Sequence, residues 1–68
     1  MKKADPETLE RIRVWFRNNA LNRQPFEVLD LQNQYNARNR LSGFLQACEE
    51  FDLISHDEAA TMFKELTK

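Results

Sequence analysis

Two side chains in this sequence belong to the types that carry acid–base or nucleophilic catalysis, His56 and Cys48. His56 stands beside Asp57 and Glu58, and a histidine next to carboxylates can serve as a general base if a nucleophile or a substrate pocket is held nearby. However, His56 directly follows Ser55 at the predicted start of a helix, a position that favours an exposed side chain. We therefore interpret His56 as a surface residue.

Cys48 follows Phe44 and Leu45 at helical spacing, so it lies on an apolar stripe. A buried thiol in that position acts as a small hydrophobic side chain and not as a thiolate nucleophile. Since Gly43 is the only glycine, the sequence has no glycine-rich loop of the kind that binds phosphate groups. These observations predict no catalytic residue and no enzymatic activity.

The sequence also lacks the pattern of a metal site. One cysteine and one histidine cannot supply the ligands of a zinc site, and the acidic residues from Glu49 to Glu58 lack the alternating oxygen ligands and central glycine of a calcium loop. We expect neither a metal ion nor a cofactor. A single thiol is typical of a reducing compartment, no apolar run is long enough to span a bilayer, and the start Met1–Lys3 is not followed by an apolar signal core. The sequence therefore predicts a cytoplasmic protein without a membrane segment.

Nucleic-acid binding is one function that the basic residues suggest. Arginine dominates them, and arginine favours two-pronged contacts with phosphate. The stretch Gln32–Arg40 is also rich in groups that can hydrogen-bond to base edges. Against this, the formal net charge is −1, whereas a nucleic-acid-binding module usually has a basic balance. The residues that would form this surface are Arg11, Arg17, Arg38 and Arg40.

Protein–protein interaction is the function that the sequence favours. A chain of 68 residues without a disulfide or a metal is near the size at which one core gives only marginal stability. The helix predicted for residues 6–21 carries apolar side chains on several sides. Those outside its main stripe, Val14, Trp15 and Leu21, are the predicted contacts for a partner protein or for a second copy in a homodimer. The alternative is that later helices of the same chain cover Val14 and Trp15.

Charge is distributed unevenly along the chain. Residues 1–40 contain eight Lys or Arg and five Asp or Glu, a net of +3, whereas residues 41–68 contain two Lys and six Asp or Glu, a net of −4. Such asymmetry can orient a chain against a partner or against its own copy. An ordinary protein surface with uneven charge is the simpler interpretation.

The first helix has a clear start. Asp5 offers a side-chain acceptor at the N-cap, and Pro6 fits the first helical position. Apolar residues then recur at helical spacing on one face. We expect a helix over residues 6–21, after a flexible tail at residues 1–4. Pro25 ends this element and opens the next.

From Pro25 to Asp52 the chain is almost free of helix breakers, yet its apolar residues form two stripes. These stripes are rotated by well over ~90° from each other, and no large apolar residue lies between them at residues 36–40. We favour two helices, over residues 25–36 and 39–52; the alternative is one continuous helix whose two ends pack on different neighbours. The first stripe consists of Val28, Leu31 and Tyr35, and the second of Leu41, Phe44, Leu45, Cys48 and Phe51.

The last helix is the best-defined element of the sequence. Ser55 can accept a hydrogen bond from the backbone three residues later, and Glu58 can reach back to Ser55, which together form a capping box. We expect a helix over residues 56–67. Ile54, just before the cap, should pack on Ala59 as a hydrophobic staple.

Together these elements predict an all-α protein, a single helical domain over residues 1–68 built as a small bundle of three to four short helices. The expected function is that of a small, non-enzymatic regulatory or adaptor protein. In its size, few glycines and lack of an active site, the chain is similar to accessory proteins of phages and plasmids that bind and modulate host machinery. The expected core consists of Leu9, Ile12, Phe16, Leu31, Leu41, Phe44, Leu45, Cys48, Phe51, Phe63 and Leu66.

Overall fold

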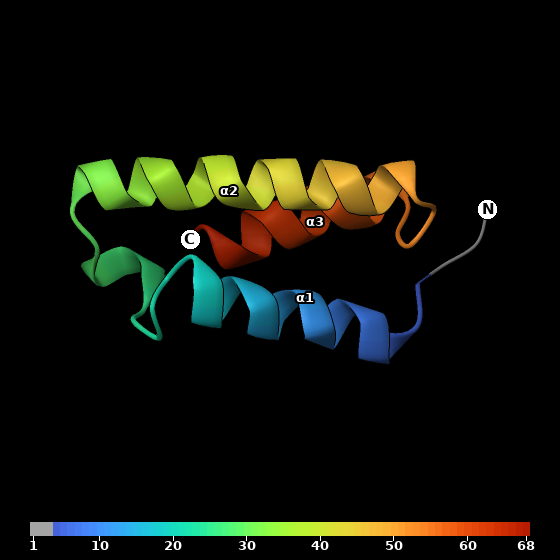
Figure 1. Ribbon diagram of the computed structural model, residues 1–68, viewed down its shortest axis with the longest axis horizontal. Helices are drawn as coiled ribbons and strands as arrows, with labels where there is room; N and C mark the ends of the chain where they lie inside the picture. The colour runs from blue at the N-terminus through green and yellow to red at the C-terminus, as the bar shows by residue number, and fades with distance from the viewer. Residues whose placement is uncertain (1–3) are drawn as a thin grey trace.

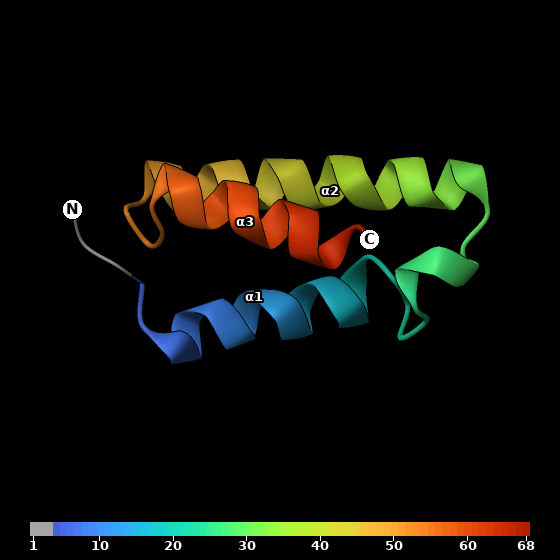
Figure 2. The ribbon, with the colours of Figure 1, turned by 180° about the vertical axis from the view of Figure 1, so that it is seen from behind.

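The computed structural model of the protein describes residues 4–68, and this part of the chain forms three α-helices and one short 3-10 helix (Figure 1, Figure 2). No strand forms within these residues, so the predicted all-α class is confirmed. The elements in chain order are α1 (Pro6–Asn19), η1 (Phe26–Val28), α2 (Leu31–Glu50) and α3 (His56–Leu66).

The helices lie along one long axis, and the molecule measures 37 × 18 × 16 Å. Figure 1 shows α1 and α2 running in opposite directions, and α3 turning back beside α2 to end near the middle of the molecule. The 11 residues of α3 span about 16 Å, whereas the 20 residues of α2 span about 30 Å. As a result, α3 accompanies the C-terminal part of α2 and leaves its N-terminal part without that neighbour.

Each α-helix begins at a side-chain cap. The Asp5 carboxylate accepts a hydrogen bond from the backbone N–H of Thr8 at 2.8 Å, as the sequence predicts. The capping box of α3 is also confirmed, because Ser55 Oγ accepts from Glu58 N–H at 3.1 Å and Glu58 Oε1 accepts from Ser55 N–H at 2.8 Å. Asp30, which the sequence reasoning did not identify, caps α2.

The predicted break at residues 36–40 is wrong, because α2 is continuous from Leu31 to Glu50. Residues 36–40, which include no large apolar residue, still contact other parts of the protein through Ala37 and Arg40. Ala37 is almost fully buried and gives the helix a close core contact there, and Arg40 Nη1 donates to the Asn19 carbonyl at the end of α1 (3.0 Å). The predicted helix over residues 25–36 is replaced by the single turn η1 and the first part of α2.

The turn after α1 begins two residues earlier than predicted. The helix ends at Asn19, and Asn22 and Arg23 take up left-handed backbone angles, with φ of 53° and 64°. Arg23 N–H donates to the Arg17 carbonyl at 2.8 Å, which holds this turn against the end of the helix. The reversal places Leu21 in the core.

The end of α2 has the hydrogen bonds of a Schellman motif. The N–H of Leu53 donates to the Cys48 carbonyl at 2.9 Å, and the N–H of Asp52 donates to the Glu49 carbonyl at 3.0 Å. Asp52 has a left-handed φ of 59°, at the position where glycine is preferred. The motif reverses the chain into α3 and leaves Phe51 and Leu53 exposed.

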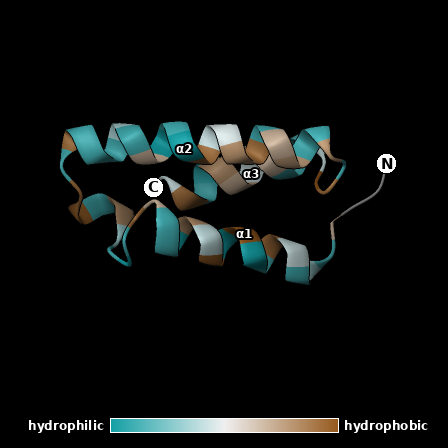
Figure 3. Ribbon diagram, viewed as in Figure 1, coloured by the Kyte–Doolittle hydropathy of each residue, from teal (hydrophilic) through white to brown (hydrophobic). Residues whose placement is uncertain are grey.

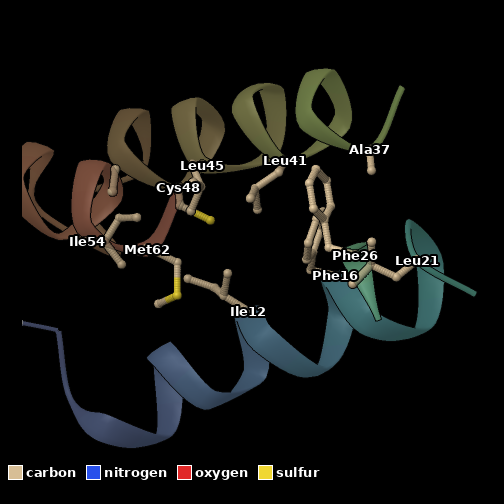
Figure 4. Packing of buried hydrophobic residues seen from close by; sticks show 11 residues of the cluster. Ile12, Phe16, Leu21, Phe26, Ala37, Leu41, Leu45, Cys48, Ile54 and Met62 are labelled. Atoms are coloured by element: carbon tan, nitrogen blue, oxygen red, sulfur yellow. The ribbon is translucent and has the colours of Figure 1, made fainter. Parts of the chain in front are cut away.

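Apolar side chains from all four elements and the turns meet in one core, with Phe16 and Leu41 fully buried (Figure 4). Leu9, Phe44, Phe63 and Leu66 from the predicted core are partly buried and pack against it. Leu31 and Phe51 were predicted in the core and are instead exposed. The buried residues are Ile12, Phe16, Leu21, Phe26, Ala37, Leu41, Leu45, Cys48, Ile54, Ala59 and Met62.

Polar contacts join α1 to α3 beyond this core. The Ala4 N–H donates to the Glu58 carboxylate at 3.0 Å, so Ala4 is held and is not part of a loose tail; the rest of the predicted tail, residues 1–3, lies outside the described residues. Arg13 Nε donates to Glu65 Oε2 at 2.7 Å. This hydrogen bond and its charge attraction raise the pKa of Arg13 and lower the pKa of Glu65.

Candidate interaction surface

The three residues that the sequence offered as partner contacts do not form one free surface. Leu21 is buried in the core, so its assignment to a partner surface is wrong. The ring of Trp15 is stacked on Phe44 of α2, with centroids 3.9 Å apart and planes inclined by 7°. Val14 is exposed on α1. The later helix therefore covers Trp15, which is the alternative that the sequence left open, and Val14 stays at the surface.

The four arginines of the nucleic-acid hypothesis are also dispersed. The guanidinium of Arg38 lies over the Phe26 ring, 5.2 Å from its centroid, and Arg40 donates to the end of α1. Arg11 and Arg17 are exposed on α1, but six residues place them about 120° apart around the helix. Two of the four thus make contacts within the fold, and the other two point in different directions.

His56 and Cys48 occupy environments of opposite kinds. His56 is exposed, and its Nδ1 lies 2.8 Å from Glu49 Oε1. The hydrogen bond to Glu49, reinforced by the attraction of its charge, raises the pKa of His56. Cys48 is buried, and burial raises the pKa of its thiol. The His56–Glu49 pair lies at an open groove between α2 and α3, where it can hold a proton, whereas the thiol belongs to the core.

No group of three or more His, Cys, Asp or Glu side chains in residues 4–68 is arranged to hold a metal ion. None of the helices in this range combines the length and the apolar character that crossing a membrane requires.

A cluster of exposed apolar side chains lies where η1 meets α2, and we call it the α2 N-terminal patch. It consists of Val28, Leu31 and Tyr35, which are 62%, 83% and 59% exposed. Leu31 and Tyr35 are one helical turn apart and so lie on the same face of α2. Figure 3 shows hydrophobic colour on the short turn η1 and at the very start of α2, whereas the next residues of this helix are hydrophilic.

The patch is exposed because α3 is shorter than α2. Ser42 and Glu49 lie on the same side of α2 as Leu31 and Tyr35, by helical spacing, and both line the groove against α3. Towards the N-terminus of α2 that side continues past the end of α3 (Figure 2). The α2 N-terminal patch therefore occupies a helix face that is covered at one end of α2 and open at the other.

A second apolar cluster lies at the opposite end of the molecule, and we call it the turn patch. It consists of Phe51 and Leu53, which are 76% and 53% exposed in the turn between α2 and α3. The surrounding sequence, residues 48–58, contains five Asp or Glu and no Lys or Arg. The two apolar residues of the turn patch thus have exposed acidic neighbours in the sequence, Glu50 and Asp52 on either side of Phe51.

Sequence reasoning identified none of these five residues as a site. It assigned Leu31 and Phe51 to the core because both continue apolar stripes. The signal for Leu31 and Tyr35 was nevertheless present, since they form a stripe separate from the one that contains Leu41 and Leu45. Comparisons with protein-family models, with curated proteins and with solved structures gave no match to this chain.

Proposed function

We propose that this protein is a small, non-enzymatic interaction module, a regulator or adaptor, that binds a partner protein or another copy of itself through the α2 N-terminal patch. The observation that carries the proposal is the exposure of Leu31 and Tyr35 on a face of α2 that α3 leaves open, with Val28 also exposed in the preceding turn η1. Amphipathic helix faces of this kind are a recurrent means of protein recognition.

The energetic argument rests on the size of the side chains. Burying an exposed leucine or valine yields about 1.5–3 kcal/mol, and among residues 4–68 no element covers Leu31, which is 83% exposed. Tyr35 is also exposed, and tyrosine is enriched in protein interfaces because its ring packs while its hydroxyl stays hydrogen-bonded. A partner that covers all three residues would gain several kcal/mol of apolar burial.

The environments of the two candidate catalytic groups support a non-enzymatic role. Cys48 is enclosed in the core with a raised pKa, which disfavours the reactive thiolate. His56 is bound to Glu49 at an exposed position, where water keeps electrostatic interactions weak. A reduced, buried thiol also fits a cytoplasmic protein, which is part of this proposal.

The proposal can be tested with a patch variant and a matched control. Leu31→Ser with Tyr35→Ser removes the apolar surface, whereas Gln32→Ser with Asn39→Ser changes two exposed polar residues on the outer face of α2. Both variants should keep the helical circular dichroism of the wild type. The measurements are quantitative affinity capture from the native host and the solution mass by light scattering.

A partner, or an increase in mass, that disappears in the patch variant and persists in the control would support the proposal. Equal capture and equal mass for all three proteins would refute it.

Nucleic-acid binding is the competing proposal from the sequence, and one experiment separates the two. A gel shift with mixed DNA and RNA should show no complex at physiological salt under the interaction proposal. A shift that Arg11→Gln with Arg17→Gln abolishes, and that weakens steeply with salt, would favour nucleic acid instead.

A further inference from the structure

We propose that a groove at the end of α1 binds a small molecule that carries a carboxylate on a compact apolar body. Three elements form this groove: one face of α1, the turn at residues 21–25, and Leu66 at the end of α3. Its volume is about 370 Å³, within the range of about 300–1,000 Å³ that ligand sites in proteins occupy. It shares no residue with the α2 N-terminal patch or the turn patch, so this inference does not depend on the proposed function.

The groove exists because α3 ends before it has covered this side of α1. Figure 2 shows α3 running in the same direction as α1. Arg13 Nε donates to Glu65 Oε2 at 2.7 Å, and α3 ends one residue later, at Leu66. Arg17 is one helical turn further along the same face of α1, so it lies past the end of α3. The turn at residues 21–25 closes the far end of the hollow that remains.

The floor of the groove is apolar. Phe16 and Leu21 are buried and lie at the same end of the core (Figure 4). Leu66 packs against this core from α3 and is only partly buried, and Pro25 adds an exposed apolar ring on the opposite side. The apolar body of a ligand can cover Leu66 and Pro25, which favours binding because this surface then leaves water.

Two arginines at this groove are free to bind an anion. Arg13 is already engaged, since its guanidinium lies 2.7 Å from a Glu65 oxygen and 3.5 Å from a Glu10 oxygen. The side chains of Arg17 and Arg23 also line the groove, and they make no ion pair or hydrogen bond with any of residues 4–68. The planar fork of a guanidinium matches the two oxygens of a carboxylate.

The backbone of the turn holds Arg23 in an unfavourable conformation. Its φ of 64° is left-handed, a region that glycine adopts freely and that residues with a Cβ adopt rarely. The Arg23 N–H donates to the Arg17 carbonyl at 2.8 Å, so the two residues are joined through the backbone. Residues held in sparsely populated backbone regions cluster at functional sites. An arginine where glycine would cost less therefore supports a binding role for its side chain.

This arrangement selects both the head and the body of a ligand. Two guanidinium groups favour a carboxylate over a neutral or cationic head, and the apolar floor favours an apolar body over a bare anion. The three walls and the volume suit a short chain or a single ring and leave no room for an extended polypeptide. Octanoate, a carboxylate on a short alkyl chain, has these features.

The test is an NMR titration of the whole chain with octanoate. The backbone amides of Arg23 and Gln24 and the methyl groups of Leu66 report on the groove, whereas Leu31 and Tyr35 report on the α2 N-terminal patch. We expect saturable shifts at the groove, with the weak affinity of a small ligand. Octanamide, the neutral analogue, should bind about tenfold more weakly, and inorganic phosphate should cause no shift there.

Two variants and a control assign the binding to the arginines. Arg17→Gln with Arg23→Gln should weaken octanoate binding about tenfold or more. Arg11→Gln with Lys64→Gln removes the same number of charges from exposed positions outside the groove and should bind as the wild type does. Arg23→Gly relieves the left-handed backbone, so its melting temperature should equal or exceed that of the wild type, while octanoate affinity falls about threefold or more.

Equal affinity for octanoate and octanamide, or an unchanged affinity in the double arginine variant, would overturn the assignment of a carboxylate. Shifts confined to Leu31 and Tyr35, or shifts that never saturate, would show that the groove is not a site. A peptide with a C-terminal leucine is the rival occupant. If it binds about tenfold more tightly than octanoate and loses this affinity when its C-terminus is amidated, the assignment to a small molecule is wrong.

Discussion

The stack between Trp15 and Phe44 is the contact whose energetic role can be measured most directly. It joins α1 to α2 next to Phe16 and Leu45, which are buried on the same helices. Aromatic pairs contribute about 0.5–1.5 kcal/mol beyond the area that they bury. A double-mutant cycle with Trp15→Leu and Phe44→Leu isolates this coupling, because leucine keeps an apolar side chain at each position.

The structure sets the expected magnitudes. Both rings are only partly buried, so each single substitution should lower the free energy of unfolding by about 1–2 kcal/mol, below the ~3–5 kcal/mol of a fully buried aromatic truncated to alanine. The rings are nearly parallel at 3.9 Å, a less favourable arrangement than an offset or edge-to-face pair. We therefore expect a coupling energy near the lower end of its range, about 0.5–1 kcal/mol.

The assay is urea unfolding of the four proteins of the cycle, followed by circular dichroism. Trp15 fluorescence gives a second signal, because in the Phe44→Leu variant its emission should shift to the red as the ring becomes more accessible to water. A coupling energy within about 0.3 kcal/mol of zero, the usual limit of additivity, would show that the stack contributes nothing. If Trp15→Leu keeps the stability of the wild type and weakens self-association, Trp15 is an interface residue, as the sequence suggested.

Four further perturbations test other parts of the fold. Ser55→Ala removes the cap of α3 and should lower stability by about 1 kcal/mol in thermal or urea unfolding; melting curves that overlay with the wild type would contradict this. Gly43→Ala should raise stability by about 1 kcal/mol, because a Cβ at this exposed position inside α2 meets no atom within 4 Å; a lower melting temperature would show that the space is not open. Cys48 should react with a thiol reagent only as fast as the protein opens, since it is buried with a raised pKa; immediate modification of the folded protein would place it at the surface. The raised pKa of His56 makes its contact with Glu49 stabilising below about pH 6.5, and this contribution is lost as pH rises through the folded-state pKa. The melting temperature of His56→Gln should therefore lie below that of the wild type at about pH 6 and approach it at about pH 8.5. An equal difference in melting temperature at both pH values would exclude this linkage.

Local sequence signals predicted the starts of α1 and α3 and failed for the start of α2 and for the connections. The side chains of Asp5 and Ser55 each accept a hydrogen bond from the backbone N–H three residues later. The residues that form each cap are therefore close in sequence. The turn after α1 depends instead on left-handed backbone angles at Asn22 and Arg23. Nothing in those residue types requires that conformation, which accompanies the burial of the preceding residue, Leu21.

The predicted core failed where an apolar stripe extends beyond its neighbour. Phe51 continues the stripe of Leu41 and Leu45, but α2 ends at Glu50 and the chain reverses, so Phe51 turns out to solvent. Conversely, Ala37 and Phe26 are buried although neither belonged to a predicted stripe. Spacing shows which residues share a face, but only the lengths and packing of the other helices decide how much of that face is covered.

The two apolar faces of α2 account both for the wrong prediction of a helix break and for the exposed side chains of Leu31 and Tyr35. Two apolar faces about 130° apart indicate a break only if every apolar face must be buried within the chain. The structure keeps one helix: the Leu41 face enters the core, while Leu31 and Tyr35 stay exposed on the other face. A continuous helix with a second apolar face, not covered by the chain's own helices, is what an interaction module requires. Under the proposed function a partner protein covers this second face, and the Leu31→Ser with Tyr35→Ser variant tests whether it does.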